Sequence, residues 1–223
     1  MNPGRGFPFA VKVCGVRSTA EVELCARAGA THVGLNPWPH SPRRVSPAQV
    51  RPLAELSRRL GLVPVLLHLP GSPLLEGDLL SFAPGVVQWY GPLPEFLLRR
   101  LLRSGLALWE TRRPEGARAP LRRGTAALVD GPGPGAGGRG RPWAWEALRG
   151  TSLPFLLAGG LGPANVAQAV EACSPSGVDA ASHLESAPGR KDPGRVLAFC
   201  AAAREALRRW GGPPLPAPWG GPP

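Results

Sequence analysis

The chain has 223 residues, of which 43% are hydrophobic, so it is long enough to bury a sizeable core in one domain. It carries 26 Lys and Arg against 15 Asp and Glu, a formal net charge of +11. No apolar run reaches the roughly 18–20 residues of a membrane span. The N-terminal segment also lacks the long apolar stretch of a signal peptide. We therefore expect a soluble, cytoplasmic protein without a membrane partner.

Eight short apolar runs recur along the chain, and each is followed by a stretch typical of a helix. Most runs are continuous rather than alternating, as expected of parallel strands covered on both faces. The predicted strands are Phe9–Cys14, Thr31–Leu35, Leu62–Leu69, Gly85–Tyr90, Leu106–Trp109, Ala126–Asp130, Pro154–Ala158 and Val178–Ser182. Helix starts are predicted between the strands. Ser18 begins a capping-box pattern, and Ser46, Gly162 and Asp192 are each followed by a proline, which is typical of a first helical turn.

Eight strand–helix units in about 200 residues predict an α/β protein, a single-domain (β/α)8 TIM barrel over residues 9–210. A doubly wound sheet could have the same count, but its glycine fingerprint is absent after the first strand. The third helix, within Gly71–Ala83, has the weakest pattern. Two segments fall outside the repeat. These are a glycine-rich loop at Gly131–Pro142 and a Pro/Gly-rich tail at Gly211–Pro223, which we expect to be disordered.

Candidate chemistry is sought where strands end, because barrel active sites lie at the carboxyl ends of the strands. Cys14 ends the first predicted strand and Asp130 ends the sixth. A thiol and a carboxyl group facing each other there could act as general base and general acid. Two other interpretations stay open: a cysteine is often a small core residue, and Asp-Gly is a common turn. The remaining cysteines form no CxxC pair, which predicts neither a zinc site nor a disulfide framework.

Two further groups could bind anions. Arg43, in the loop after the second strand, could hold a carboxylate in a bidentate pair, although adjacent loop arginines are often simply solvated. The seventh strand ends in Gly159 and Gly160, and the eighth ends in Ala181 and Ser182. Glycines at a strand end let backbone amides approach a phosphate closely, and this pair of loops is the usual phosphate site of barrel enzymes.

Six motifs in register carry a resemblance to a known family. They are VKVCGV (11–16), AGATHVGL (28–35), SPRRVSP (41–47), LVDG (128–131), LLAGGLGPANV (156–166) and ES-PGRKDP within 185–193. In this order the chain resembles phosphoribosylanthranilate isomerase, a (β/α)8-barrel enzyme of tryptophan biosynthesis. The resemblance covers the barrel from Lys12 to about Phe199.

The resemblance implies an Amadori rearrangement of N-(5-phosphoribosyl)anthranilate to 1-(2-carboxyphenylamino)-1-deoxyribulose 5-phosphate, without cofactor or metal. The implied roles are general base for Cys14, general acid for Asp130 and carboxylate binding for Arg43. Backbone amides at Gly159 and Gly160, and at Ala181 and Ser182, would bind the phosphate. The partner would be a small phosphoribosyl substrate, and the protein a monomer or a homodimer.

Three loops depart from the family pattern. Tyr90 stands where the family has histidine after the fourth strand. Ala144 stands where the sixth-strand loop usually has aspartate, while Arg141 could replace the charge of the usual lysine. His183 replaces a glycine after the eighth strand. These changes leave open a divergent or degenerate isomerase acting on another phosphoribosyl compound.

Two rival functions compete with this interpretation. The barrel isomerase of histidine biosynthesis has an aspartate at the end of its first strand, where this chain has Cys14. A basic RNA-binding module could use the Gly-Arg stretch at 137–141 and the arginine-rich surface. That stretch lacks interleaved aromatic residues, and a nucleic-acid module would not need the barrel motifs in order. We therefore expect no nucleic-acid partner.

Overall fold

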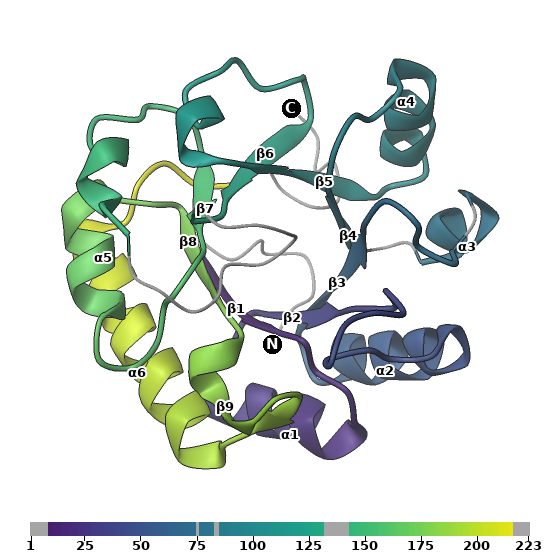
Figure 1. Ribbon diagram of the computed structural model, residues 1–223, viewed down its shortest axis with the longest axis horizontal. Helices are drawn as coiled ribbons and strands as arrows, with labels where there is room; N and C mark the ends of the chain where they lie inside the picture. The colour runs from purple at the N-terminus through teal and green to yellow at the C-terminus, as the bar shows by residue number, and fades with distance from the viewer. Residues whose placement is uncertain (1–8, 75, 83–84, 132–142, 216–223) are drawn as a thin grey trace.

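The computed structural model describes residues 9–74, 76–82, 85–131 and 143–215. Eight parallel strands follow one another in chain order around a closed barrel, and the last strand pairs with the first (Figure 1). The barrel prediction is confirmed. The strands are β1 Ala10–Cys14, β2 His32–Leu35, β3 Val63–His68, β4 Val86–Trp89, β5 Ala107–Arg112, β6 Thr125–Val129, β7 Phe155–Leu157 and β8 Gly177–Ala180.

Helices cover the outside of most, but not all, of the barrel. Those of the described residues are α1 Thr19–Ala28, α2 Pro47–Arg59, α3 Glu76–Ser81, α4 Glu95–Arg103, α5 Val166–Cys173 and α6 Pro193–Trp210. After β5 and β6 the described residues form only short 3-10 turns, η1 Pro114–Gly116 and η2 Trp145–Leu148. The expectation of a helix in every unit is wrong for β5. Two prolines and one glycine between Arg113 and Gly124 leave no uninterrupted helical run.

Capping residues explain where several helices begin. The Ser18 hydroxyl accepts from the Glu21 N–H at the start of α1, and the Asp192 carboxylate accepts from the Arg195 N–H at the start of α6. The helix expected from Gly162 begins later, at Val166. The reason is local, since the Asn165 side chain accepts from the Gly162 N–H and donates to the Gly160 carbonyl. These bonds close a turn before the helix.

Alternate residues of the strands fill the inside of the barrel. Part of this interior is a buried apolar cluster made of Ala10, Val63, Val65, Val86, Ala107, Trp109, Ala126, Leu128, Leu156 and Ala158. Leu215 packs against this cluster, while the Gly212 N–H donates to the Pro175 carbonyl just before β8. Residues 216–223 of the expected tail lie outside the described residues, so the disorder of the tail stays a prediction. Among the described helices, none is long and apolar enough to cross a membrane.

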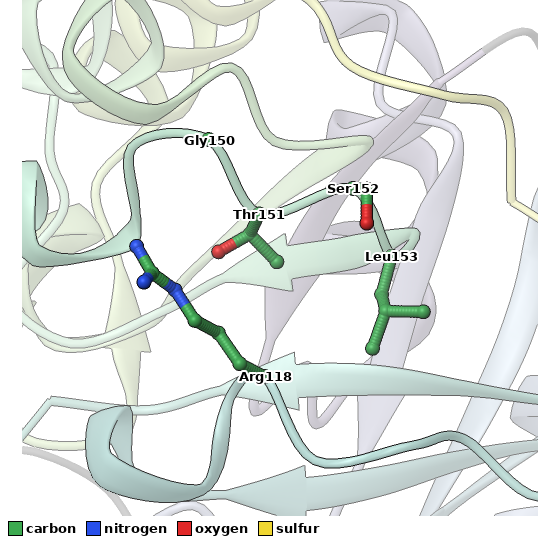
Figure 2. A pocket seen from close by; sticks show the side chains of 5 residues that line it. All are labelled: Arg118, Gly150, Thr151, Ser152 and Leu153. Atoms are coloured by element: carbon green, nitrogen blue, oxygen red, sulfur yellow. The ribbon is translucent and has the colours of Figure 1, made fainter.

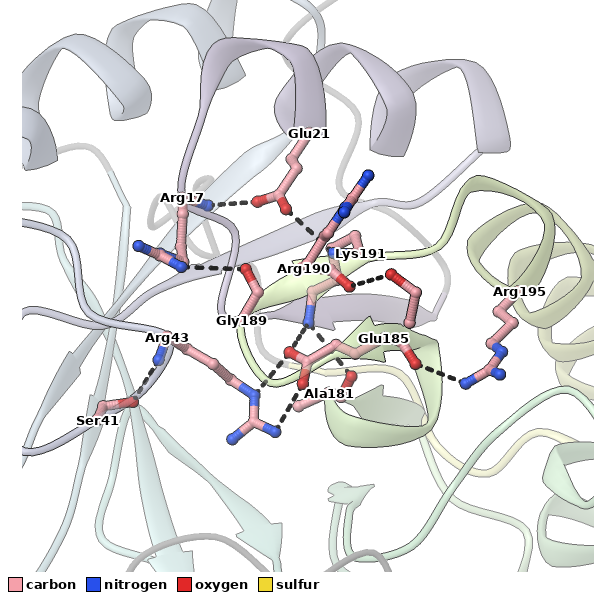
Figure 3. Close-up of polar contacts among 11 residues, drawn as sticks. Arg17, Glu21, Ser41, Arg43, Ala181, Glu185, Gly189, Arg190, Lys191 and Arg195 are labelled. Carbon is pink, nitrogen blue, oxygen red and sulfur yellow. Dashed lines mark hydrogen bonds and ion pairs between the residues drawn. The ribbon is translucent and has the colours of Figure 1, made fainter.

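A small hairpin follows β8 on the side of the barrel mouth. It consists of the 3-10 turn η3 Ser182–Leu184 and the strands β9 Glu185–Ala187 and β10 Arg190–Lys191, which pair antiparallel. This hairpin places Glu185 and Lys191 against the start of α1 and the loop after β2 (Figure 3).

Candidate active site

Cys14 lies at the barrel mouth as the last residue of β1. Its side chain is 8% exposed and packs with Leu67 and Leu69 from the end of β3. Trp38, Tyr90 and Ala181 border the same cluster. At the barrel mouth the thiol therefore packs against mostly apolar side chains from the ends of several strands.

Asp130 follows β6 at the same end of the barrel. It is 5% exposed, and its N–H donates to the Arg112 carbonyl, which continues the β5–β6 ladder past the last strand residue. Tyr90 connects the two predicted catalytic groups in space. Burial, and then the neighbouring Asp130 and Cys14, raise the pKa of the Tyr90 phenol. The structure thus brings Cys14 and Asp130 to one end of the barrel, where both neighbour Tyr90.

Tyr90, which replaces the family histidine, is held by polar residues inside the barrel. The Gln88 amide donates to the Tyr90 phenol oxygen at 2.8 Å, and Thr111 on β5 lies 3.4 Å from the same amide nitrogen. The site therefore has a neutral hydroxyl where a histidine would bring a titratable ring. Of the other departures, Ala144 immediately precedes η2, while Arg141 lies outside the described residues.

Arg43 is engaged by a carboxylate of the protein itself. Its Nε and Nη2 donate to the two oxygens of Glu185 at 2.7 and 2.9 Å, and Lys191 Nζ donates to Glu185 at 2.8 Å (Figure 3). Burial would raise the pKa of Glu185, but the bonds from Arg43 and Lys191 lower it, so the carboxylate stays charged. Among the described residues, Arg43 Nη1 has no hydrogen-bond partner, which leaves one edge of the guanidinium for a ligand.

The stem of Arg43 packs against Gly15, the residue that follows Cys14. Gly15 has a φ of +76°, and a Cβ built on it would lie 2.5 Å from Arg43 Cδ. Any side chain at this position would displace Arg43. The predicted carboxylate clamp is thus close to the predicted base, with Glu185 fixing its orientation.

The two halves of the predicted phosphate site also meet. Gly159 and Gly160 both have left-handed φ values, of +87° and +72°. A Cβ on Gly159 would lie 2.5 Å from the Gly131 nitrogen and 3.1 Å from an Asp130 carboxylate oxygen, so this loop passes directly over the end of β6. On the other side, a Cβ on Gly162 would lie 2.8 Å from His183 Cβ. The loops after β7 and β8 are therefore in contact.

Ala181 and Ser182 lie between this loop and the charged hairpin. The Ala181 carbonyl accepts from Lys191 Nζ at 3.2 Å, and Ser182 begins η3. His183 occupies the space that the absent side chain of Gly162 leaves. The histidine thus borders the predicted phosphate loop, as its place in the sequence indicates.

Two surface cavities lie away from the mouth. One of about 380 Å³ is lined by Glu95, Phe96, Arg99 and Arg103 on α4. The other, of about 130 Å³, is lined by Arg118 and by residues 150–153, which precede β7 (Figure 2). It therefore lies at the amino end of its strand, opposite to Cys14 and Asp130. The described residues contain no cluster of three or more His, Cys, Asp or Glu side chains that could hold a metal.

Sequence comparison identifies the family. Residues 11–202 match the family described as N-(5'phosphoribosyl)anthranilate (PRA) isomerase. The chain belongs to this family. It is 34% identical to the N-(5'-phosphoribosyl)anthranilate isomerase of Rhodopseudomonas palustris, with 89% of this chain and 97% of the relative covered. The corresponding enzyme of Cereibacter sphaeroides is 36% identical, with 87% and 98% covered.

Structural comparison agrees. The crystal structure of phosphoribosyl anthranilate isomerase from Thermotoga maritima superposes with a TM-score of 0.76 at 25% identity. The match covers 88% of this chain and 99% of that one. The resemblance drawn from the six sequence motifs is confirmed at the level of family and fold, while the roles of individual residues stay predictions.

Sequence reasoning missed two members of the site. Glu185, which holds Arg43, and Lys12, which is buried beneath Cys14, were not singled out. Glu185 is 142 residues from Arg43 in the chain, so no local pattern indicates their pairing. Lys12 did carry a signal, because a lysine inside the continuous apolar run of a barrel strand requires a buried partner.

Proposed function

We propose that this chain isomerises N-(5'-phosphoribosyl)anthranilate to 1-(2-carboxyphenylamino)-1-deoxyribulose 5-phosphate. The observation that carries the proposal is the placement of Cys14 and Asp130 at one barrel mouth. Both border Tyr90, beside the contacting loops after β7 and β8. Family membership supports the same reaction. The substrate is then a small phosphoribosyl compound; the expectation of a monomer or homodimer stays a prediction.

Binding uses the anion-recognising groups on both sides of the thiol. Arg43 Nη1, on the edge of the guanidinium not held by Glu185, binds the anthranilate carboxylate. The phosphate lies against the backbone amides of Gly159 and Gly160 on one loop, and of Ala181 and Ser182 on the other. Fixing both ends of the substrate places the ribose between Cys14 and Asp130, so that neither proton transfer needs a large movement.

The reaction divides between acid and base. Asp130 protonates the ribose ring oxygen as the bond between that oxygen and C1 breaks, and the nitrogen lone pair forms a C1=N iminium. The Cys14 thiolate then removes the C2 proton. The electrons of that C–H bond form a C1=C2 double bond and neutralise the nitrogen, and the resulting enolamine tautomerises to the ketone. Each positioned proton transfer contributes about 10²–10⁴-fold in rate.

A fluorescence assay that follows consumption of phosphoribosylanthranilate tests the function. Wild type should consume it, and Cys14→Ala should not. The matched control is Cys25→Ala, because Cys25 is a fully buried thiol on α1 and belongs to the apolar core. A wild type that leaves this substrate unchanged would overturn the proposal and favour a divergent isomerase with another phosphoribosyl substrate.

A further inference from the structure

A buried ion pair lies one residue layer below Cys14 inside the barrel. Lys12 and Cys14 are two apart on β1 and share its inward face. Lys12 is completely buried, and its Nζ lies 2.9 Å from an oxygen of Asp179. Asp179 is its direct neighbour in the β1–β8 register. Stability alone does not account for such a pair, since apolar residues of similar volume often serve a core equally well or better.

Gly34 brings the lysine and the sulfur together. It pairs with Cys14 in the β1–β2 register. A Cβ built on Gly34 would lie 2.8 Å from Cys14 Sγ and 3.2 Å from Lys12 Cε. Both side chains therefore converge on one point above this glycine, and a larger residue there would displace the sulfur or the lysine stem.

The charges have opposite effects on the thiol. The pKa of Cys14 lies above its ordinary value, because burial raises it, the Lys12 ammonium lowers it by less, and Asp179 raises it again. Burial would lower the pKa of Lys12, but Asp179 and Cys14 raise it above its ordinary value, so Lys12 stays charged. His32, on β2, is neutral, because burial and Lys12 lower its pKa to about 3.

Other titratable groups face the mouth as well. Lys191, on the hairpin, lowers the pKa of Cys14 more weakly than Lys12 does. Tyr90 borders the thiol from the end of β4, and Asp130 faces Tyr90 from the end of β6. Arg43 comes from the loop after β2, with its guanidinium held by Glu185. Among these groups, Lys12 combines complete burial with a place on the same strand face as the sulfur.

We propose that Lys12, held by Asp179, is a positioning residue that keeps a positive charge beside the Cys14 sulfur and so stabilises the thiolate. The inference rests on the proposed function in that Cys14 is the base. During the base step the thiolate takes the C2 proton and becomes a thiol, while Lys12 stays an ammonium and Asp179 a carboxylate. Neither residue touches the substrate. The pair acts only through the charge state of the sulfur.

The test measures the thiol directly, without relying on turnover. The rate of Cys14 alkylation by iodoacetamide is followed against pH, with the modified peptide quantified by mass spectrometry. Lys12→Met should shift the profile to higher pH by about one unit, the lower range for loss of a neighbouring opposite charge. Asp179→Asn should shift it to lower pH, because the anion that disfavours the thiolate is gone. The acid limb of kcat/KM should move in the same two directions.

Folding is controlled separately, because Lys12→Met leaves Asp179 buried and unpaired. The double variant Lys12→Met/Asp179→Leu carries no unpaired charge, and it should still show the alkaline shift, since Lys12 acts on the thiol more strongly than Asp179 does. Arg51→Met is the matched control. It removes one positive charge from an exposed position on α2 and should leave the profile unchanged.

The outcomes separate this inference from the proposed function. Profiles for folded Lys12→Met and for the double variant that superpose on wild type would overturn the role of Lys12. If the shifts occur but wild type does not consume phosphoribosylanthranilate, the proposed function fails and the effect of Lys12 on the thiol stands.

Discussion

The wall of the barrel formed by β8, β1 and β2 differs from the wall formed by β5 and β6. The first is covered by the helices α6, α1 and α2, whereas only short turns follow the strands of the second in the described residues (Figure 1). In the first wall, buried charges pair close to the mouth, as in Lys12 with Asp179 and Lys191 with Glu185. In the second wall, a partly exposed cluster around Glu110 pairs farther from Cys14. Fully buried ion pairs therefore accompany the proposed site, and partly exposed ion pairs accompany the wall without helices.

The largest expected effect comes from removing either proposed catalytic group, Cys14 in the first wall or Asp130 in the second. Cys14→Ala and Asp130→Asn should each lower kcat by about 10²–10⁴-fold, because each removes one of the two proton transfers. The double variant should be little worse than the poorer single variant, since the steps occur in sequence on one substrate. Steady-state kinetics measure this, and thermal melting checks that the fold persists. Near-normal turnover in either single variant would remove that residue from the mechanism.

The next largest effect is expected at the loop that joins the walls. Gly159→Ala should lower kcat/KM about tenfold or more and also lower the melting temperature. The new Cβ would meet the Gly131 backbone and approach Asp130, in a backbone conformation that disfavours any side chain. Gly105→Ala is the matched control, with a φ of +84° and open space around its Cβ position. It should cost roughly 1 kcal/mol of stability and leave kinetics unchanged. Equal kinetic losses in both variants would contradict the role of close approach.

A smaller, binding-specific effect is expected from the pair that orients Arg43. Glu185→Gln should raise KM about tenfold, because hydrogen bonds to a charged group contribute about 1.5–3 kcal/mol and the guanidinium would lose its fixed orientation. The kcat value should change little, since neither proton transfer involves Glu185. Arg43→Lys should raise KM as well, because an ammonium cannot bridge Glu185 and a substrate carboxylate in the same way. A change in kcat without a change in KM would contradict this assignment.

Whether the sequence predicts a feature depends on whether the contacts that form it are local or distant in the chain. All eight strands were predicted, because a continuous apolar run of four to eight residues is a local signal. The start of α5 was placed too early, since the bonds that Asn165 makes to Gly160 and Gly162 compete with a helix there. Partners across the barrel could not be predicted. Lys12 and Asp179 are 167 residues apart, and only the strand register brings them together.

The smallest effect on activity is expected in the wall formed by β5 and β6. A substitution there should change the stability of the fold and leave the kinetics unchanged. Glu110 accepts from Arg122 and Thr125 at 3.0 and 2.9 Å, and from Arg112 at 3.2 Å. These contacts tie β5 to Arg122, which precedes β6, and to Thr125, the first residue of β6. Glu110→Gln should therefore lower the free energy of unfolding by about 2 kcal/mol, with kcat and KM unchanged.

The pH dependence makes this last prediction specific. Burial would raise the pKa of Glu110, but hydrogen bonds from Arg122, Thr125 and Arg112 lower it below its ordinary value. A carboxylate with a lowered pKa stabilises the folded state above the unfolded pKa, about 4.3, and this stabilisation is lost as the pH falls through the folded pKa. Urea unfolding at pH 7 should thus separate wild type from Glu110→Gln, and the difference should diminish progressively as the pH falls below about 4. A difference that stays constant down to low pH would show that shape, rather than charge, makes Glu110 stabilising.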